Sequence, residues 1–222
     1  MDHKQKSRKP ISRYSDVIFD MDGVLIDSIE LWIEIGYQGL KEQNIEATRE
    51  QIIKGIVKFT TLEKLGVPDI RVFGERINTL FCERVLETRL QKNILPVLKQ
   101  LSGSKKRLSV LTTSGRAAVD GILKNLKIYD YFDTTITFDD VMNHKPDPEG
   151  VFTILKKHNV KPENAIIIGD TRNDIVAGKS AAISTVMYYP DIHEQIYDKD
   201  HLLALNADYY IRDLNELLPI IL

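Results

Sequence analysis

Short apolar segments alternate with amphipathic segments over the second half of this 222-residue chain. The apolar segments are rich in branched side chains, which is typical of strands buried on both faces of a sheet. Because helical patterns separate these segments, we expect consecutive strands to run parallel and to be joined by right-handed crossovers. The predicted strands are 17–19, 108–111, 134–138, 165–168, 185–189 and 207–211, and the predicted helices between them include 96–101, 119–126 and 151–155. The alternation predicts an α/β fold with a doubly wound parallel sheet.

A helical stretch interrupts this alternation after the first strand. The apolar residues of its first helix recur at helical spacing and form one buried face, namely Ile29, Trp32, Ile33, Gly36, Tyr37 and Leu40. Only helical signals follow from residue 48 to about residue 91, and Cys82 lies in one of them as a predicted small buried side chain. We therefore expect an α-helical subdomain at residues 28–93, inserted into an α/β core of residues 15–27 and 94–222.

The composition excludes several kinds of partner. Lys and Arg number 30 and Asp and Glu number 32, so the chain lacks the basic excess of many nucleic-acid-binding proteins. Uncharged stretches are too short for a membrane span, and the basic residues 1–14 are expected to be a disordered tail. A single cysteine fits a reducing compartment, so we expect a cytoplasmic protein without nucleic-acid or membrane partners. The histidines have no metal-binding spacing and are expected at the surface, at positions His3, His144, His158, His193 and His201.

Three of the predicted strands end in polar residues. These are Asp20 and Asp22 after the first strand, Thr112 and Thr113 after the second, and Asp170 and Asp174 after the strand at 165–168. The carboxyl ends of parallel strands meet at one edge of a sheet, so we expect these side chains to converge there. Lys145 precedes a predicted helix and can reach the same edge.

Carboxylates held together repel one another unless a cation balances them or their pKa values rise. Oxygen ligands of this kind suit Mg²⁺, while a lysine, hydroxyls and main-chain amides suit a phosphoryl group. An aspartate in such a site can attack phosphorus, and a second one can transfer a proton. The residues alone leave alternatives open: a polar turn for Asp20 and Asp22, a helix cap for Asp174, and a surface position for Lys145.

Four segments in order resemble the haloacid dehalogenase superfamily, in its phosphatase branch, over roughly residues 15–214. The segments are Asp20-Met21-Asp22-Gly23-Val24-Leu25-Ile26-Asp27-Ser28, Val110-Leu111-Thr112-Thr113, Lys145-Pro146-Asp147-Pro148 and Gly169-Asp170-Thr171-Arg172-Asn173-Asp174. The resemblance implies a Rossmann-like core and a mobile helical cap, inserted between the first two segments, that closes over the site and selects the substrate.

The resemblance also implies a role for each residue of these segments. Asp20 is expected to be the nucleophile that forms an aspartyl-phosphate, and Asp22 the acid–base. The expected Mg²⁺ ligands are the Asp20 carboxylate, the main-chain carbonyl of Asp22, Asp170, and Asp174 directly or through water. The expected phosphate-binding groups are Thr112, the amide of Thr113, and Lys145, which also balances the charge of Asp20.

The implied activity is hydrolysis of a small phosphorylated metabolite, such as phosphoglycolate, a sugar phosphate or a nucleotide-like compound. One alternative is a phosphomutase of the β-phosphoglucomutase type, although that group carries a histidine in the first cap helix where this chain has Trp32. Another alternative is a non-catalytic binding module on the same scaffold. Lys54, Lys58 and Arg116 are candidate substrate contacts, with an exposed, solvated position as the alternative for each.

Overall fold

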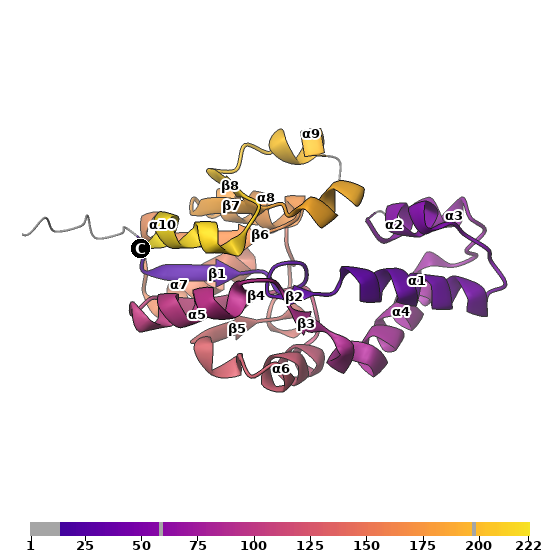
Figure 1. Cartoon of the computed structure of the whole chain (residues 1–222), viewed down its shortest axis with the longest axis horizontal. Helices are drawn as coiled ribbons and strands as arrows, with labels where there is room; N and C mark the ends of the chain where they lie inside the picture. The colour runs from indigo at the N-terminus through magenta and orange to yellow at the C-terminus, as the bar shows by residue number, and fades with distance from the viewer. Residues whose placement is uncertain (1–13, 58–59, 197–198) are drawn as a thin grey trace, which may run out of the picture.

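A six-stranded parallel sheet forms the centre of the molecule (Figure 1). The computed structural model describes residues 14–57, 60–196 and 199–222. Its strands are β1 (Asp16–Phe19), β4 (Arg107–Leu111), β5 (Thr134–Ile136), β6 (Ala165–Gly169), β7 (Ser184–Tyr188) and β8 (Tyr209–Ile211). Their order is β5-β4-β1-β6-β7-β8, so β1 lies in the middle, with β4 and β5 on one side and β6, β7 and β8 on the other. The order reverses beside β1, which is where ligand crevices form in such sheets. The predicted doubly wound α/β fold is confirmed.

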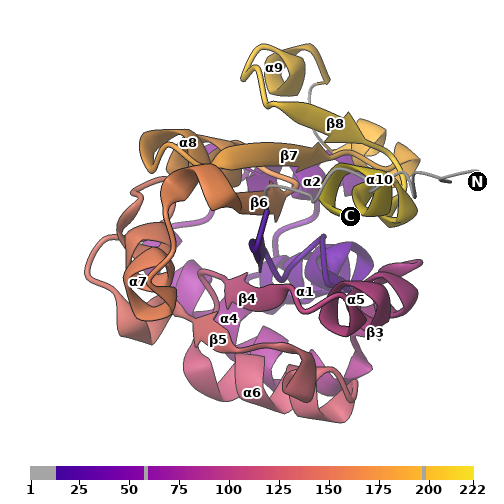
Figure 2. The same ribbon diagram turned by 90° about the vertical axis from the view of Figure 1, so that its left-hand side faces the viewer.

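Alternate side chains of β1 enter two different hydrophobic clusters, one on each face of the sheet. Val17 and Phe19 belong to the cluster covered by α5, α6 and α10, while Ile18 belongs to the cluster covered by α7 and α8. Figure 2 shows helices on both sides of the sheet. These helices are α5 (Ile94–Gly103), α6 (Arg116–Asn125), α7 (Glu149–His158), α8 (Arg172–Ser180) and α10 (Leu217–Ile221), with α9 (Lys199–Leu203) before β8. Burial on both faces explains why β1 is apolar throughout its interior.

Five short 3₁₀ helices complete the core. They are η2 (Tyr129–Tyr131), η3 (Phe138–Asp140), η4 (Pro162–Asn164), η5 (Asp191–Gln195) and η6 (Leu214–Glu216). The strand predicted at 134–138 therefore ends earlier, since Asp140 caps η3 with its carboxylate and the chain turns at Thr137.

Helices α1 to α4 lie between two short strands that pair with each other. The elements are β2 (Ile26–Asp27), α1 (Ile29–Glu42), α2 (Arg49–Val57), α3 (Thr60–Glu63), α4 (Ile70–Arg84), η1 (Val85–Glu87) and β3 (Arg89–Leu90). In the antiparallel pair, Ile26 lies opposite Leu90 and Asp27 opposite Arg89, so residues 89–90 are a strand and not part of a helix. Figure 1 shows this helical group beyond the end of β1. The predicted cap boundaries at residues 28 and 93 remain a prediction.

The amino-terminal edge of the sheet holds a buried polar network that the sequence did not predict. Tyr14 is buried and its hydroxyl donates to Ser184 at 3.0 Å, so Tyr14 does not belong to the disordered tail that was expected at residues 1–14. Residues 1–13 lie outside the described part of the chain. His158 was expected at the surface, but its Nδ1 lies 2.7 Å from the buried carboxylate of Asp16. Arg107 donates to the same carboxylate at 2.7 Å. Within the described residues, no helix is long and apolar enough to cross a membrane.

Candidate active site

The chain turns sharply after β1 and brings two aspartates to the edge of the sheet. The amide of Asp20 donates to the carbonyl of Ile168, which extends the pairing of β1 with β6 by one residue. Gly23 then adopts a φ of +79°, a conformation that favours glycine. A Cβ atom at Gly23 would overlap the Asp170 carboxylate, so the absence of a side chain lets the two strand ends approach each other. Asp20 and Asp170 thereby come from different strands to one place.

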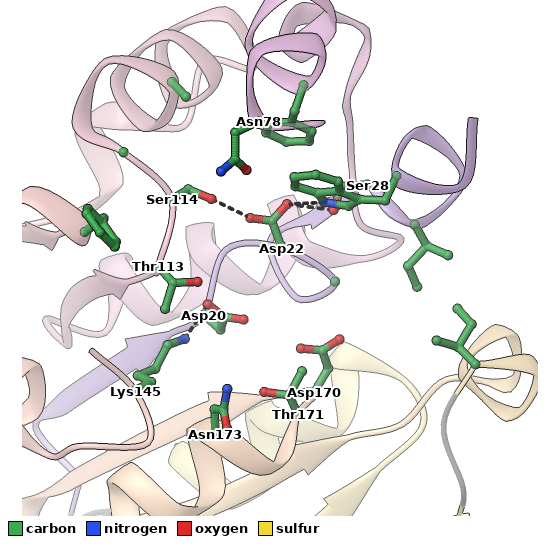
Figure 3. A pocket seen from close by; sticks show the side chains of 18 of the residues that line it. Asp20, Asp22, Ser28, Asn78, Thr113, Ser114, Lys145, Asp170, Thr171 and Asn173 are labelled. Carbon is green, nitrogen blue, oxygen red and sulfur yellow. Dashed lines mark hydrogen bonds and ion pairs between the residues drawn. The ribbon is translucent and has the colours of Figure 1, made fainter. Parts of the chain in front are cut away.

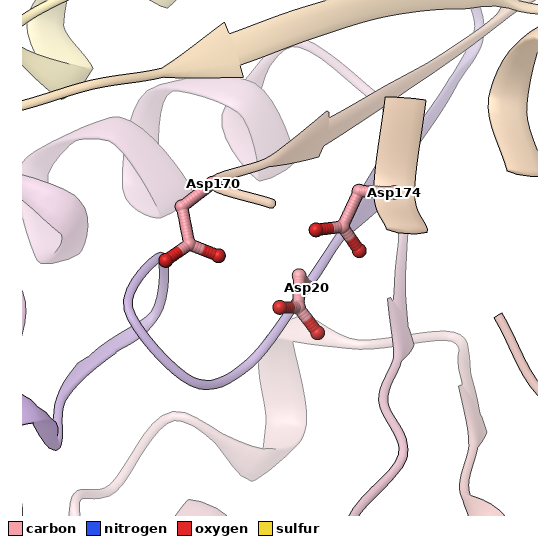
Figure 4. A group of neighbouring side chains, drawn as sticks. All are labelled: Asp20, Asp170 and Asp174. Atoms are coloured by element: carbon pink, nitrogen blue, oxygen red, sulfur yellow. The ribbon is translucent and has the colours of Figure 1, made fainter. Parts of the chain in front are cut away.

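Asp20, Asp170 and Asp174 form a buried cluster in which the facing carboxylate oxygens lie within 4.8 Å of one another (Figure 4). Their exposed fractions are 7%, 2% and 0%. Burial, together with the neighbouring Asp174 charge, raises the pKa of Asp20 to about 7. Burial and then the Asp20 charge raise the pKa of Asp170 well above its ordinary value. The cluster therefore favours a bound cation.

Lys145 supplies one positive charge to this cluster. Its ammonium donates to Asp20 Oδ1 and to Asp174 Oδ1, both at 2.6 Å, and its side chain is 5% exposed. Burial alone would lower the pKa of Lys145, but the charges of Asp174 and Asp20 outweigh it and raise that pKa, so the group stays protonated. The alternative of a surface lysine is therefore wrong.

The second oxygen of Asp174 caps helix α8. Asp174 Oδ2 accepts from the amide of Thr171 at 3.1 Å and from its hydroxyl at 2.6 Å, while Asp174 Oδ1 remains in the cluster with Lys145. Asp174 therefore caps α8 with one oxygen and belongs to the acidic cluster with the other, so the two interpretations are compatible.

The donor set of the cluster fits a magnesium ion. Asp170 Oδ1 is fully buried and has no hydrogen-bond partner among the described residues. A buried carboxylate oxygen without a donor is costly unless a cation contacts it. All the available groups are oxygens, as Mg²⁺ prefers, and Lys145 balances only one of three carboxylates. The Asp22 carboxylate lies outside the cluster, so its metal contact through the main chain remains a prediction.

Asp22 is held by donors from two separate parts of the chain (Figure 3). Ser28 Oγ donates to Asp22 Oδ1 at 2.8 Å, and Trp32 Nε1 lies 3.5 Å from the same oxygen. Ser114 Oγ, from the loop after β4, donates to Asp22 Oδ2 at 3.0 Å. These contacts orient the Asp22 carboxylate separately from Asp20, which suits a second role.

Trp32 was predicted to be a core residue, and this prediction holds only in part, because the side chain packs against the hydrophobic cluster of Val17 and Phe19 but is not enclosed by it. The side chain is half-buried, lines the cavity described below, and stacks on Phe81 of α4 with ring centroids 4.2 Å apart and planes 4° apart. A helix face that lines a cavity carries the same apolar pattern as a face that packs against a core. The pattern alone therefore could not separate the two.

The polar loop after β4 brings one of its two predicted residues to the cavity. Thr113 lines the cavity, whereas Thr112 is 4% exposed and its hydroxyl accepts from the amide of Ser114 at 3.1 Å. The Thr112 hydroxyl keeps its own hydrogen for donation. Ser114 was not predicted, although the polar run Thr112-Thr113-Ser114 was the available signal.

A cavity of about 630 Å³ opens above the acidic cluster, within the usual range for small-molecule sites. Three groups of residues line it on this side: Asp20, Asp22 and Gly23 after β1, Asp170, Thr171 and Asn173 after β6, and Lys145 from the loop before α7. The opposite wall comes largely from α1, α2 and α4. Cys82 was predicted to be buried but is exposed on α4 and lines this wall.

Two of the three candidate substrate contacts, Lys54 and Arg116, do not line this cavity. Lys54 is 66% exposed and pairs with Glu50 at 2.6 Å. Arg116 pairs with Asp140 and donates to the carbonyl of Thr135. Neither residue lines the cavity. Lys58 lies outside the described residues.

His193 was predicted at the surface but is fully buried near the cluster. Its Nδ1 lies 3.9 Å from Asp170 Oδ2, and burial lowers the pKa of His193 to about 4, so the ring is neutral at neutral pH. It lies on η5, whose irregular spacing gave no sequence signal.

A parallel α/β sheet with aspartates and a lysine gathered at its switch point has the architecture of an enzyme whose site lies at the strand ends. A family model described as haloacid dehalogenase-like hydrolase matches residues 17–188. The chain belongs to this family. A pyrophosphatase PpaX from Oceanobacillus iheyensis is 28% identical over 218 residues, which cover 92% of this chain and 95% of that protein.

Solved structures agree with this assignment. A haloacid dehalogenase-like hydrolase from Bacteroides fragilis has a TM-score of 0.80 and 25% identity, and the match covers 92% of this chain and 100% of that chain. A protein described as a β-phosphoglucomutase from Thermotoga maritima has a TM-score of 0.76 and 25% identity, with coverages of 94% and 100%. The predicted membership of the phosphatase branch of this enzyme family is confirmed.

Proposed function

We propose that this chain is a Mg²⁺-dependent phosphatase that hydrolyses a small phosphorylated metabolite through an aspartyl-phosphate on Asp20. The observation that carries this proposal is the buried cluster of three aspartates next to the single charge of Lys145. One oxygen of Asp170 in this cluster has no hydrogen-bond partner in the described part of the chain. Asp20, Asp170 and Asp174 would hold the ion, which when bound would neutralise charge on the phosphoryl oxygens.

Asp20 is suited to attack phosphorus. Its Oδ1 accepts from Lys145, while no donor among the described residues contacts its Oδ2, which leaves that oxygen free to form the new bond. As the Asp20 Oδ2–P bond forms, the bond between phosphorus and the ester oxygen breaks. Lys145 and the residues after β4, Thr112 and Thr113, are the proposed partners of the phosphoryl oxygens.

Asp22 is suited to transfer the proton in both halves of the reaction. In the first half its carboxyl protonates the departing ester oxygen. In the second half its carboxylate takes a proton from water as that water attacks the phosphorus of the aspartyl-phosphate, which releases phosphate and restores Asp20. Ser28 and Ser114 hold the Asp22 carboxylate in a fixed orientation on either side.

The proposal is tested by measuring phosphate release from a panel of phosphate esters with Mg²⁺ and with EDTA. The wild-type enzyme is expected to release phosphate only with the metal. The matched variant Asp20→Asn keeps the shape of the side chain and is expected to lose activity by at least about 10³-fold. A panel that includes β-glucose 1-phosphate separates the two activities considered, because a mutase isomerises this compound while a phosphatase releases phosphate. Equal activity of the wild type and Asp20→Asn would contradict the proposal.

A further inference from the structure

The cavity has two chemically different halves. The half that contains the acidic cluster is charged and polar. The opposite half is formed mainly by apolar side chains from α1, α2, α4, α6 and η3 and from the residue after η5, namely Ile29, Trp32, Ile33, Ile53, Phe81, Ala118, Phe138 and Ile196. A substrate whose phosphoryl group contacts Asp20 therefore extends its organic group along an apolar wall.

Within the described part of the chain, the apolar wall offers no positive charge to a substrate. Lys145 is the one cationic side chain among the described residues that line the cavity, and its ammonium already donates to Asp20 and Asp174. Lys54 and Arg116 are paired with acids elsewhere. A second anionic group carried along the apolar wall would thus lose its hydration without gaining a counter-charge, which is unfavourable.

Three aromatic side chains and one amide give the wall its recognition chemistry. Trp32 stacks on Phe81, and Phe138 lines the cavity while 49% of its surface is exposed. An exposed aromatic side chain beside a cavity is suited to contact an apolar group or ring of a ligand. Asn78 lies on α4 with its amide directed into the cavity (Figure 3), and this neutral amide has no hydrogen-bond partner among the described residues. Asn78 therefore suits an uncharged polar group.

We propose that this site selects phosphate monoesters whose organic group is uncharged and largely apolar, and discriminates against substrates with a second anionic group. The proposal rests on the proposed phosphatase function and names its substrate class. It predicts poor use of phosphoglycolate and of inorganic pyrophosphate, both of which carry a second anionic group next to the transferred phosphoryl group.

A matched pair of substrates tests the proposal. Benzyl phosphate and phosphoglycolate share the same CH₂–O–P unit and differ in whether a phenyl ring or a carboxylate follows it. The wild-type enzyme is expected to show a kcat/KM for benzyl phosphate that exceeds that for phosphoglycolate by roughly 100-fold. Equal values or a preference for phosphoglycolate would overturn the proposal and leave the phosphatase function intact. Failure to release phosphate from either ester would contradict the phosphatase function itself.

Variants at Cys82 test whether the charge of the wall causes the selection. Cys82 is exposed on α4 and lines the cavity, so a longer side chain fits there without disturbing the core. Cys82→Lys adds a cation and is expected to lower the ratio of kcat/KM for benzyl phosphate to kcat/KM for phosphoglycolate by at least about tenfold. Cys82→Met adds length without charge and is expected to keep this ratio high. The ratio is unaffected by a general loss of activity, and an unchanged ratio in Cys82→Lys would overturn the proposal.

Discussion

Replacement of Lys145 by methionine removes the only positive charge that the described residues place inside the acidic cluster. The ammonium of Lys145 contacts Asp20 and Asp174 at 2.6 Å each, and all three side chains are nearly or fully buried. Methionine keeps most of the length and apolar stem of lysine, so the substitution tests the charge more than the packing. Lys145→Arg serves as the matched variant that keeps the charge.

The size of the effect follows from these distances. At an effective dielectric constant near 20, each contact corresponds to roughly 6 kcal/mol of attraction, most of which is offset by the cost of removing the charges from water. Leaving the two carboxylates buried without the lysine is expected to cost about 3–5 kcal/mol of folding free energy in the absence of metal. Loss of a charged partner of the phosphoryl group is expected to reduce kcat by about 10²–10³-fold.

Steady-state hydrolysis of an aryl phosphate with saturating Mg²⁺ measures the loss of kcat, and chemical denaturation in EDTA measures the loss of stability. The metal should restore part of the stability of Lys145→Met, because it replaces the missing positive charge. A Lys145→Met enzyme that keeps kcat within about threefold of wild type and unfolds at the same denaturant concentration would refute the proposed role of this lysine.

Three further predictions concern the metal, the turn after β1 and the orientation of Asp22. In the metal-free protein the pKa of Asp20 is raised to about 7, so its protonated carboxyl stabilises the fold at low pH and this contribution is lost as the pH rises through 7. Because Mg²⁺ competes with this proton, thermal denaturation should show a larger stabilisation by Mg²⁺ at about pH 8.5 than at about pH 6. Equal stabilisation at the two pH values would contradict the assignment of Asp20 as a metal ligand. Gly23→Ala places a methyl group against Asp170 at a positive φ and should abolish the stabilisation by Mg²⁺ in the same assay, whereas an unchanged response would show that the turn tolerates a side chain. Trp32→Phe keeps an aromatic ring but removes the indole donor to Asp22, and it should lower kcat by about tenfold with little change in KM; an unchanged kcat would exclude that role.

The sheet and the acidic cluster were predictable because their signals are local. Val17 to Phe19 form an apolar run that needs burial on both faces, and the acids that follow it are adjacent in sequence. The parallel topology then brings Asp170 and Lys145 to the same edge. Each of these steps depends on residue order and general strand geometry, which a single sequence contains.

The apolar half of the cavity was not predictable in the same way. Trp32 and Cys82 lie in amphipathic helical patterns, and such a pattern does not distinguish a helix face against a core from one against a cavity. His193 becomes buried because it packs beside Asp170 and against Tyr188, which depends on long-range packing. The pair of two-residue strands, β2 and β3, is too short to give a periodic signal.

Detection of a phosphorylated Asp20 tests the central claim most directly. The Asp22→Asn variant should accumulate this species with p-nitrophenyl phosphate, because that good leaving group departs without an acid while the hydrolysis of the aspartyl-phosphate still needs a base. Rapid acid quench followed by mass spectrometry of the peptide that contains Asp20 is expected to show one added phosphoryl group on that residue. Turnover of the same ester with no phosphorylation at Asp20, or with phosphorylation at another residue, would contradict the account.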